Sequence, residues 1–165
     1  MTEDPMVPTE DGEQAPLAIP EIDRSIDRIL VPVDGSPGSE IGMAWADLVA
    51  RTAGAEIIVC VGFNPPSAIR RRGILETEHL RVEMEEDALE VATEAAQLFL
   101  DRGHRARAVV VVGDPAESIL QTAEAEDVDL IVMGRRGLGR LEGMLVGSVS
   151  ERVARHATVP VFLTS

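Results

Sequence analysis

The sequence predicts one α/β domain built on an open, parallel β-sheet with helices on both faces. Short apolar runs such as 29–33 and 56–61 are continuous rather than alternating, as in strands that are buried on both faces. Segments with helical periodicity separate these runs, and strands that alternate with helices form parallel sheets. The chain has 165 residues, of which 45% are hydrophobic, enough for one compact domain.

Local start and stop signals bound the expected elements. Ser36 is an expected N-cap, Pro37 an expected first helical residue, and Gly54 closes the helix that they begin. Asp114 and Glu117 form a capping box with a proline at the first helical position. The expected strands are 29–33, 56–61, 107–112, 129–133 and 160–164, and the expected helices are 37–53, 75–102, 115–126 and 148–156.

The order of the five strands is expected to be 3-2-1-4-5, as in flavodoxin-like and Rossmann-like sheets. This order places the carboxyl ends of strands 29–33 and 129–133 side by side. Ligands of open α/β sheets bind at such a switch point, beyond the carboxyl ends of the strands. The loops that begin at Asp34 and Gly134 are therefore expected to face each other across one crevice.

The N-terminal segment differs from the rest in composition. The first 23 residues hold seven acids, four prolines and no basic residue. Such a segment buries too little apolar surface to offset its ordering entropy. We expect residues 1–24 to form a flexible acidic tail, with a regulatory or docking arm as the alternative, and residues 25–165 to form the domain.

Charge and composition exclude several classes of function. The net charge of -14 argues against a nucleic-acid partner and against an anionic membrane surface. All fifteen basic residues are Arg, so the chain lacks the Lys of a P-loop and of a Schiff-base enzyme. With no signal-peptide pattern and no run long enough to span a membrane, a cytoplasmic protein without membrane insertion is expected.

The single cysteine, Cys60, lies in an apolar run and is expected to be a buried hydrophobe.

A glycine-rich loop follows the strand at 129–133. Its glycines let backbone N–H groups approach an anion, and the helix that begins at Ser148 favours negative charge at its N-terminus. Arg135, Arg136 and Arg140 add positive charge to an otherwise acidic chain. Ser148 and Glu151 have the spacing of a capping box. The spacing alone leaves two alternatives: a phosphate site, or a tight connection whose glycines serve only turns.

Several motifs, in register from about residue 28 to 164, resemble the universal stress protein family of the ATP-binding type. The spacing Gly134-x2-Gly137-x9-Gly147-Ser148 is similar to that family's nucleotide signature. Four further stretches resemble its conserved elements: ILVPVDGS at 29–36, GDPAESIL at 113–120, DLIVMG at 129–134 and GSVSERVARHATVPVFL at 147–163.

The resemblance implies a role for each matching residue. Pro32, Val33 and Asp34 would line the adenine and ribose side, and Val61 would present backbone groups to the adenine edge. Met133 and Gly134 would border the ribose, and the phosphates would be held by Gly137, Gly147, Ser148 and Val149. Arg136 is a further candidate because of its positive charge in the same loop. The carboxylate of Asp34 could accept from the ligand, or could cap the turn that it begins. No residue is assigned as a metal ligand, and none as catalytic.

The expected function is that of a protein that binds ATP, with Mg²⁺ as the resemblance implies, as a regulatory ligand with little or no hydrolysis. Three alternatives stay open: AMP or cyclic AMP as the ligand, a nucleotide-independent protein that regulates a partner such as a transporter, and a hydrolase acting on adenine nucleotides. The last strand is apolar and lies at an edge, which is an aggregation hazard unless it is covered. The family that the chain resembles covers this edge by pairing across a two-fold axis, so the resemblance implies a homodimer through 159–164.

Overall fold

The computed structural model describes residues 19, 21–64, 74–137 and 147–165. Within these residues, five strands alternate with four helices along the chain, as predicted. The strands are β1 (Arg28–Pro32), β2 (Glu56–Phe63), β3 (Ala106–Val112), β4 (Leu130–Gly134) and β5 (Val161–Thr164). The helices are α1 (Pro37–Ala53), α2 (Ile74–Leu100), α3 (Pro115–Ala125) and α4 (Ser148–His156).

The strands form one sheet in the order β3-β2-β1-β4-β5, which confirms the predicted order. All four neighbouring pairs are parallel. Strands β1 and β4 lie on either side of the switch point, and Ile29 of β1 lies opposite Leu130 of β4. The loops that follow these two strands therefore leave the sheet at the same edge.

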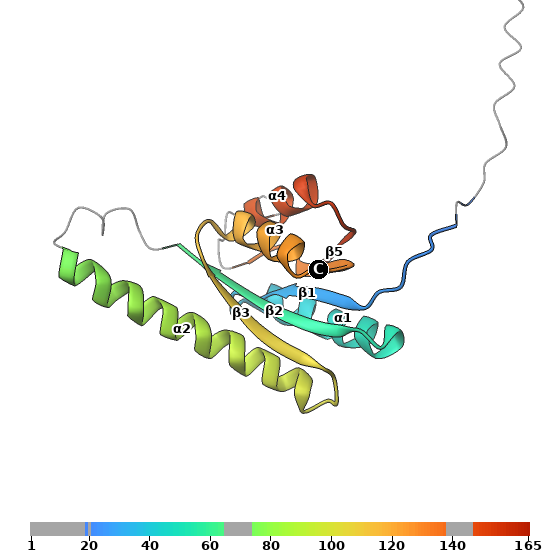
Figure 1. The fold of residues 1–165 in the computed structure, drawn as a ribbon, viewed down its shortest axis with the longest axis horizontal. Helices are drawn as coiled ribbons and strands as arrows, with labels where there is room; N and C mark the ends of the chain where they lie inside the picture. Colours follow the sequence, from blue (N-terminus) through green and yellow to red (C-terminus); the bar gives the residue numbers. More distant parts are fainter. Residues whose placement is uncertain (1–18, 20, 65–73, 138–146) are drawn as a thin grey trace, which may run out of the picture.

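Two apolar layers cover the two faces of the sheet. Helices α1 and α2 lie on one face and α3 and α4 on the other (Figure 1). Ile29, Val31 and Val59 are buried on the α1–α2 side, and Leu30 and Ile131 are buried on the α3–α4 side. Successive strand residues thus point into opposite cores, which is why the strands are apolar throughout rather than alternating.

Two element boundaries differ from the prediction by two residues, and the others agree with it to within one residue. Strand β2 continues past Val61 to Phe63, because β3 pairs with it along this whole length and Phe63 lies opposite Val112. Helix α2 ends at Leu100, two residues early, and a turn then leads to Gly103 with φ of 85°. Three parts of the sequence lie mainly outside the described residues: the expected acidic tail, a run of three arginines at 70–72, and Arg140 of the glycine-rich loop. No described helix is long and apolar enough to cross a bilayer.

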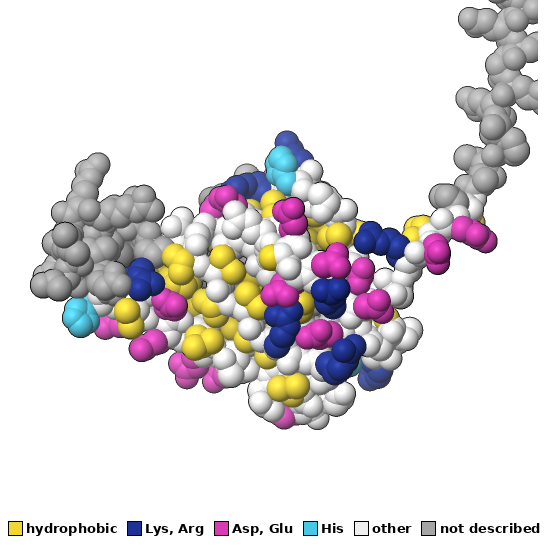
Figure 2. Space-filling view, viewed as in Figure 1, with side chains coloured by type: hydrophobic (Ala, Val, Ile, Leu, Met, Phe, Trp, Pro, Cys, Tyr) yellow, Lys and Arg dark blue, Asp and Glu magenta, His cyan; other side chains and the backbone are white. Residues whose placement is uncertain are grey.

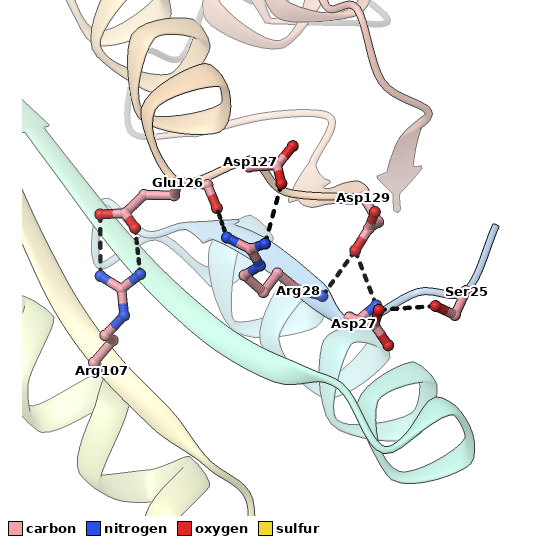
Figure 3. Close-up of polar contacts among 7 residues, drawn as sticks. All are labelled: Ser25, Asp27, Arg28, Arg107, Glu126, Asp127 and Asp129. Atoms are coloured by element: carbon pink, nitrogen blue, oxygen red, sulfur yellow. Dashed lines mark hydrogen bonds and ion pairs between the residues drawn. The ribbon is translucent and has the colours of Figure 1, made fainter.

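Ion pairs and carboxylate hydrogen bonds join the segments at the amino end of the sheet (Figure 3). Arg107 of β3 donates to both carboxylate oxygens of Glu126, at the end of α3. Arg28 donates to the carboxylate of Asp127 at 3.1 Å, and Asp129 accepts the backbone N–H of Arg28 at 3.0 Å. Side chains of both signs therefore gather where the strands begin, at the right of the face in Figure 2.

Candidate functional site

A hollow of about 220 Å³ lies at the carboxyl ends of β1 and β4, between the two loops that the sequence singled out. Ten of the eleven predicted site residues line it: Pro32, Val33, Asp34, Met133, Gly134, Arg136, Gly137, Gly147, Ser148 and Val149. The structure thus brings together residues that are more than a hundred positions apart in the chain, because β1 and β4 are neighbours in the sheet.

Val61 is the predicted site residue that does not line the hollow. Its side chain lies in the core on the α1–α2 face, 8% exposed. The residues before and after it, Cys60 and Gly62, line the hollow instead. Side-chain direction alternates along a strand, so the Val61 side chain faces away from the hollow. The role expected for Val61 is a contact through its backbone groups, and this role stays a prediction.

The first turn of α4 presents backbone N–H groups without a side-chain cap. Gly147 is the N-cap residue, and no side chain bonds the amides of the first turn. The first bond along the helix runs from the N–H of Glu151 to the carbonyl of Gly147, at 2.9 Å. The amides of residues 148–150 precede that bond and have no partner within the helix. Ser148 and Val149 line the hollow, so this turn borders it directly.

The predicted capping box of Ser148 and Glu151 is wrong. Ser148 is the first helical residue rather than the N-cap, and the position before it is a glycine without a side chain. The neighbouring helices differ: Ser36 caps α1 through the N–H of Ser39, and Asp114 caps α3 through the N–H of Glu117. Of these three helix N-termini, only that of α4 leaves its amides to another partner.

Glycines allow the two loops to touch through their backbones. A Cβ on Gly38, in the first turn of α1, would collide with the carbonyl oxygen of Arg136. A Cβ on Gly134 would in turn collide with the carbonyl group of Gly38. Gly137 is packed as closely against the carboxylate of Asp34. The glycine spacing therefore fixes how closely α1 and the loop after β4 approach each other.

Asp34 is the only acid among the described residues that line the hollow. Its Oδ1 accepts the backbone N–H of Ser36 at 3.1 Å, so it stabilises the turn after β1. The residue is also exposed, and it lines the hollow together with Arg136. Capping of the turn, one of the two expected roles, is thus present; acceptance from a ligand stays a prediction.

Six further residues line the hollow that the sequence did not single out: Ser39, Cys60, Gly62, Pro115, Ile119 and Ser150. Pro115 and Ile119 come from the first turns of α3, which follows β3 rather than β1 or β4. Together with Val33 and Met133 they give the hollow an apolar wall. The thiol of Cys60 has a raised pKa because it is buried, so it stays neutral beside this wall.

The described residues offer little to a metal ion. They contain no group of three or more His, Cys, Asp or Glu side chains that could hold one. Among the histidines, His104 lies away from the hollow and bonds Asp47 at 2.8 Å. Mg²⁺ commonly binds through one or two carboxylates, water and the phosphates of its substrate, and here Asp34 is the carboxylate that could take part.

Fold and hollow define the class: an open parallel α/β protein with a hollow and an uncapped helix N-terminus at its switch point. The universal stress protein family model matches residues 25–165, and the chain belongs to this family. A universal stress protein of Thermus aquaticus is 37% identical over 136 residues, which cover 82% of this chain and 96% of that protein.

Solved structures share the fold. Protein MJ0577 of Methanocaldococcus jannaschii has a TM-score of 0.76 at 28% identity, covering 86% of this chain and 96% of its own. Two more distant structures, at 24% and 22% identity, are a universal stress protein in complex with cAMP and one from Archaeoglobus fulgidus in complex with dAMP. Their TM-scores are 0.62 and 0.60; they cover 86% and 84% of this chain, and each covers 98% of its own chain.

Proposed function

We propose that the hollow binds an adenine nucleotide and that the uncapped first turn of α4 binds its phosphates. The observation that carries this proposal is the contrast between helix N-termini: side chains cap α1 and α3, whereas Gly147 leaves the amides of α4 open beside the hollow. Open amides at a helix N-terminus attract anions through their hydrogen bonds and through the helix dipole. The guanidinium of Arg136 at the same rim adds positive charge.

The apolar wall supports a flat, weakly polar group at the other side of the hollow. Val33, Met133 and Ile119 are 7%, 6% and 4% exposed and present aliphatic surface. An adenine ring gains free energy from contact with such surface and still needs a few polar partners at its edge. The family neighbours that hold cAMP and dAMP contain this same base, which favours adenine over other bases.

ATP, accompanied by Mg²⁺, is the ligand that we propose, and it would act as a regulatory ligand in a stress response. AMP and cyclic AMP are the alternatives, because they share the base and the need for an anion site. Mass spectrometry of the molecule that copurifies with the chain, followed by competition calorimetry with and without Mg²⁺, separates these ligands. Recovery of AMP or cyclic AMP alone, with no affinity for ATP, would replace ATP in the proposal.

Gly147→Asp tests the proposal, because it gives α4 the same cap that Asp114 gives α3. The backbone of Gly147, with φ of -74° and ψ of 154°, suits any N-cap residue, so the fold should remain or gain stability. The new carboxylate would bond the amides and repel phosphates, and we expect at least a ~100-fold loss of ATP affinity. Calorimetry and thermal unfolding of the same sample measure both effects.

Gly147→Ala is the matched control for this experiment. Its methyl group would meet the carbonyl oxygen of Arg135 at 3.3 Å, so it introduces the steric part of the change without a cap or a charge. We expect its affinity to lie between those of the wild type and Gly147→Asp. Wild-type affinity in a well-folded Gly147→Asp protein would refute the assignment of the phosphate site.

We propose binding rather than rapid turnover. Asp34, the one acid among the described lining residues, already bonds the turn after β1, which makes it a poor general base. Steady-state release of phosphate at more than trace rates would favour the hydrolase alternative. A chain that binds no nucleotide at all would favour the alternative of an interaction protein that regulates a partner.

We also propose a homodimer that pairs through residues 159–164. Strand β5 lies at an edge of the sheet, and its residues Val161, Phe162 and Leu163 are only partly buried. Phe162 contacts Trp45 of α1 with ring centroids 5.3 Å apart, so aromatic surface continues from this edge onto a helix. Light scattering should give the mass of two chains; a single-chain mass would contradict this interface. The cytoplasmic location stays a prediction.

A further inference from the structure

Ser150 joins the first turn of α4 to the loop after β4. It is the third residue of the helix and is only 2% exposed. Its hydroxyl lies 2.7 Å from the carbonyl oxygen of Arg135 and 2.9 Å from that of Gly147. A hydroxyl has one proton to donate, so the two carbonyls share it. The carbonyl of Arg135 also accepts the N–H of Gly147 at 2.7 Å, so two donors from α4 meet on one acceptor.

The backbone N–H of Arg135 is hydrogen-bonded as well. Its N–H donates to the carbonyl of Thr164, at the end of β5, at 2.9 Å. Arg135 therefore extends the hydrogen bonding between β4 and β5 by one residue. The hydrogen bond to Thr164 fixes the backbone of Arg135, and the hydroxyl of Ser150 bonds helix α4 to the carbonyl of this residue.

Ser39 occupies the equivalent position in α1 and shows what is particular to Ser150. It too is the third residue of its helix, is buried at 5% exposure and lines the hollow. Its hydroxyl donates to the carbonyl of Ser36 at 2.8 Å, the N-cap residue of the same helix. The bond from Ser39 therefore stabilises one helix, whereas the bond from Ser150 to Arg135 fixes a helix against a different segment.

We propose that Ser150 is a positioning residue for the anion site. Through the Arg135 carbonyl it holds the first turn of α4 in the orientation that points the amides of Ser148 and Val149 into the hollow. This inference rests on the proposed function of the same amides. Because the apolar wall for the base comes from β1, β4 and α3, Ser150 should influence the phosphate contacts and leave the base contacts alone.

The experiment compares ATP with adenosine on the full chain, by calorimetry, for the wild type and Ser150→Ala. We expect about a tenfold loss of affinity for ATP and less than about a twofold change for adenosine, which has no phosphate. Ser150→Thr keeps the hydroxyl and should restore most of the ATP affinity. Ser39→Ala should lower ATP affinity less, by about threefold or below, since it breaks no bond between segments.

NMR spectra of the same proteins give a second readout. ATP should shift the amide signals of Ser148 and Val149 in the wild type and in Ser150→Thr, and shift them less in Ser150→Ala at saturation. Equal losses for ATP and adenosine, or no loss for either, would overturn the positioning role while the nucleotide site stands. A wild-type chain that binds neither compound would overturn the proposed function, and this inference with it.

Discussion

The two ends of the sheet handle polar groups in opposite ways. At the amino end, charged side chains pair with each other: Arg107 with Glu126, and Arg28 with Asp127 (Figure 3). At the carboxyl end, glycines replace side chains, and the backbone amides of α4 border a hollow. One end satisfies its polar groups internally, and the other leaves donors for a ligand.

This difference shows where the fold accepts a cost in stability. A side-chain cap contributes about 1 kcal/mol to a helix relative to alanine but only a few tenths relative to glycine, so Gly147 forgoes a small stabilisation of α4. At the amino end the charged side chains are paired instead. Arg107 donates a hydrogen bond to Glu126, which lowers the pKa of the Glu126 carboxyl. Substitutions at the carboxyl end should therefore change binding more than folding, and those at the amino end the reverse.

Gly38→Val should have the largest effect and tests whether the carboxyl end depends on backbone contact. Its Cβ would collide with the carbonyl of Arg136, which cannot move without the loop after β4. We expect about 2 kcal/mol of destabilisation from overpacking and about a 100-fold loss of nucleotide affinity. Urea unfolding and calorimetry measure the two quantities.

Ala44→Val is the control for that prediction. It adds the same branched side chain on the exposed side of α1, away from the loop. Its cost should be the lower helix propensity of valine, about 0.5 kcal/mol, with no change in affinity. If Gly38→Val behaved like Ala44→Val, the close approach of the two loops would have no functional role.

Arg107→Met should have an intermediate effect, on stability alone. The guanidinium donates to Glu126 and, through Nε at 3.1 Å, to Glu56. Removing it leaves two carboxylates without their cation, and we expect about 1 kcal/mol of destabilisation in urea unfolding. Nucleotide affinity should not change, because the site lies at the other end of the sheet.

The exposed pair of Arg155 and Glu151 gives the matched comparison for Arg107. Their side chains are 69% and 57% exposed, against 40% and 28% for Arg107 and Glu126. Arg155→Met should therefore cost less than about 0.5 kcal/mol. Equal costs for the two variants would mean that the amino-end network adds nothing beyond a surface ion pair.

The smallest expected effect concerns pH. The pKa of Asp114 is lowered because the backbone N–H of Glu117 donates to its carboxylate and Arg152 bonds it at 2.9 Å. The unfolded chain then binds the proton more readily than the native one. The stabilisation is present above the ordinary pKa of ~3.9 and is lost as the pH falls through the lower native value.

Asp114→Asn keeps an acceptor at the N-cap of α3 but cannot titrate there. Urea unfolding at about pH 5 and about pH 2.5 should show a smaller loss of stability on acidification for this variant than for the wild type. Arg152→Met, which removes the second cause of the shift, should lie between them. Parallel losses in all three proteins would show that Asp114 does not contribute to acid sensitivity.

The fold was largely predictable because each strand carries its own signal. Continuous apolar runs marked all five strands, and Ser36 and Asp114 marked two helix starts that the structure confirms. The strand order came from a general rule about switch points rather than from any one residue. The extension of β2 to Phe63 was missed because only its pairing with β3 determines where it ends.

The site was predictable where it follows β1 and β4 and less so elsewhere. Pro115 and Ile119 reach the hollow from α3, and no local pattern in the sequence says that this helix packs against β2. The start of α4 was misjudged because Ser148 and Glu151 have capping-box spacing, whereas the backbone makes Gly147 the N-cap. Residue spacing alone does not show which residue is the N-cap, the residue with non-helical backbone angles that precedes the helix.

The open first turn of α4 also links folding to the ligand supply. An anion that bonds these amides binds only the folded chain, so it raises the free energy of unfolding with its concentration. At a hundred times its dissociation constant, the gain is about 2.7 kcal/mol. The melting temperature of this protein would then report the nucleotide level around it, and a chain emptied of ligand would be the form most readily unfolded and degraded.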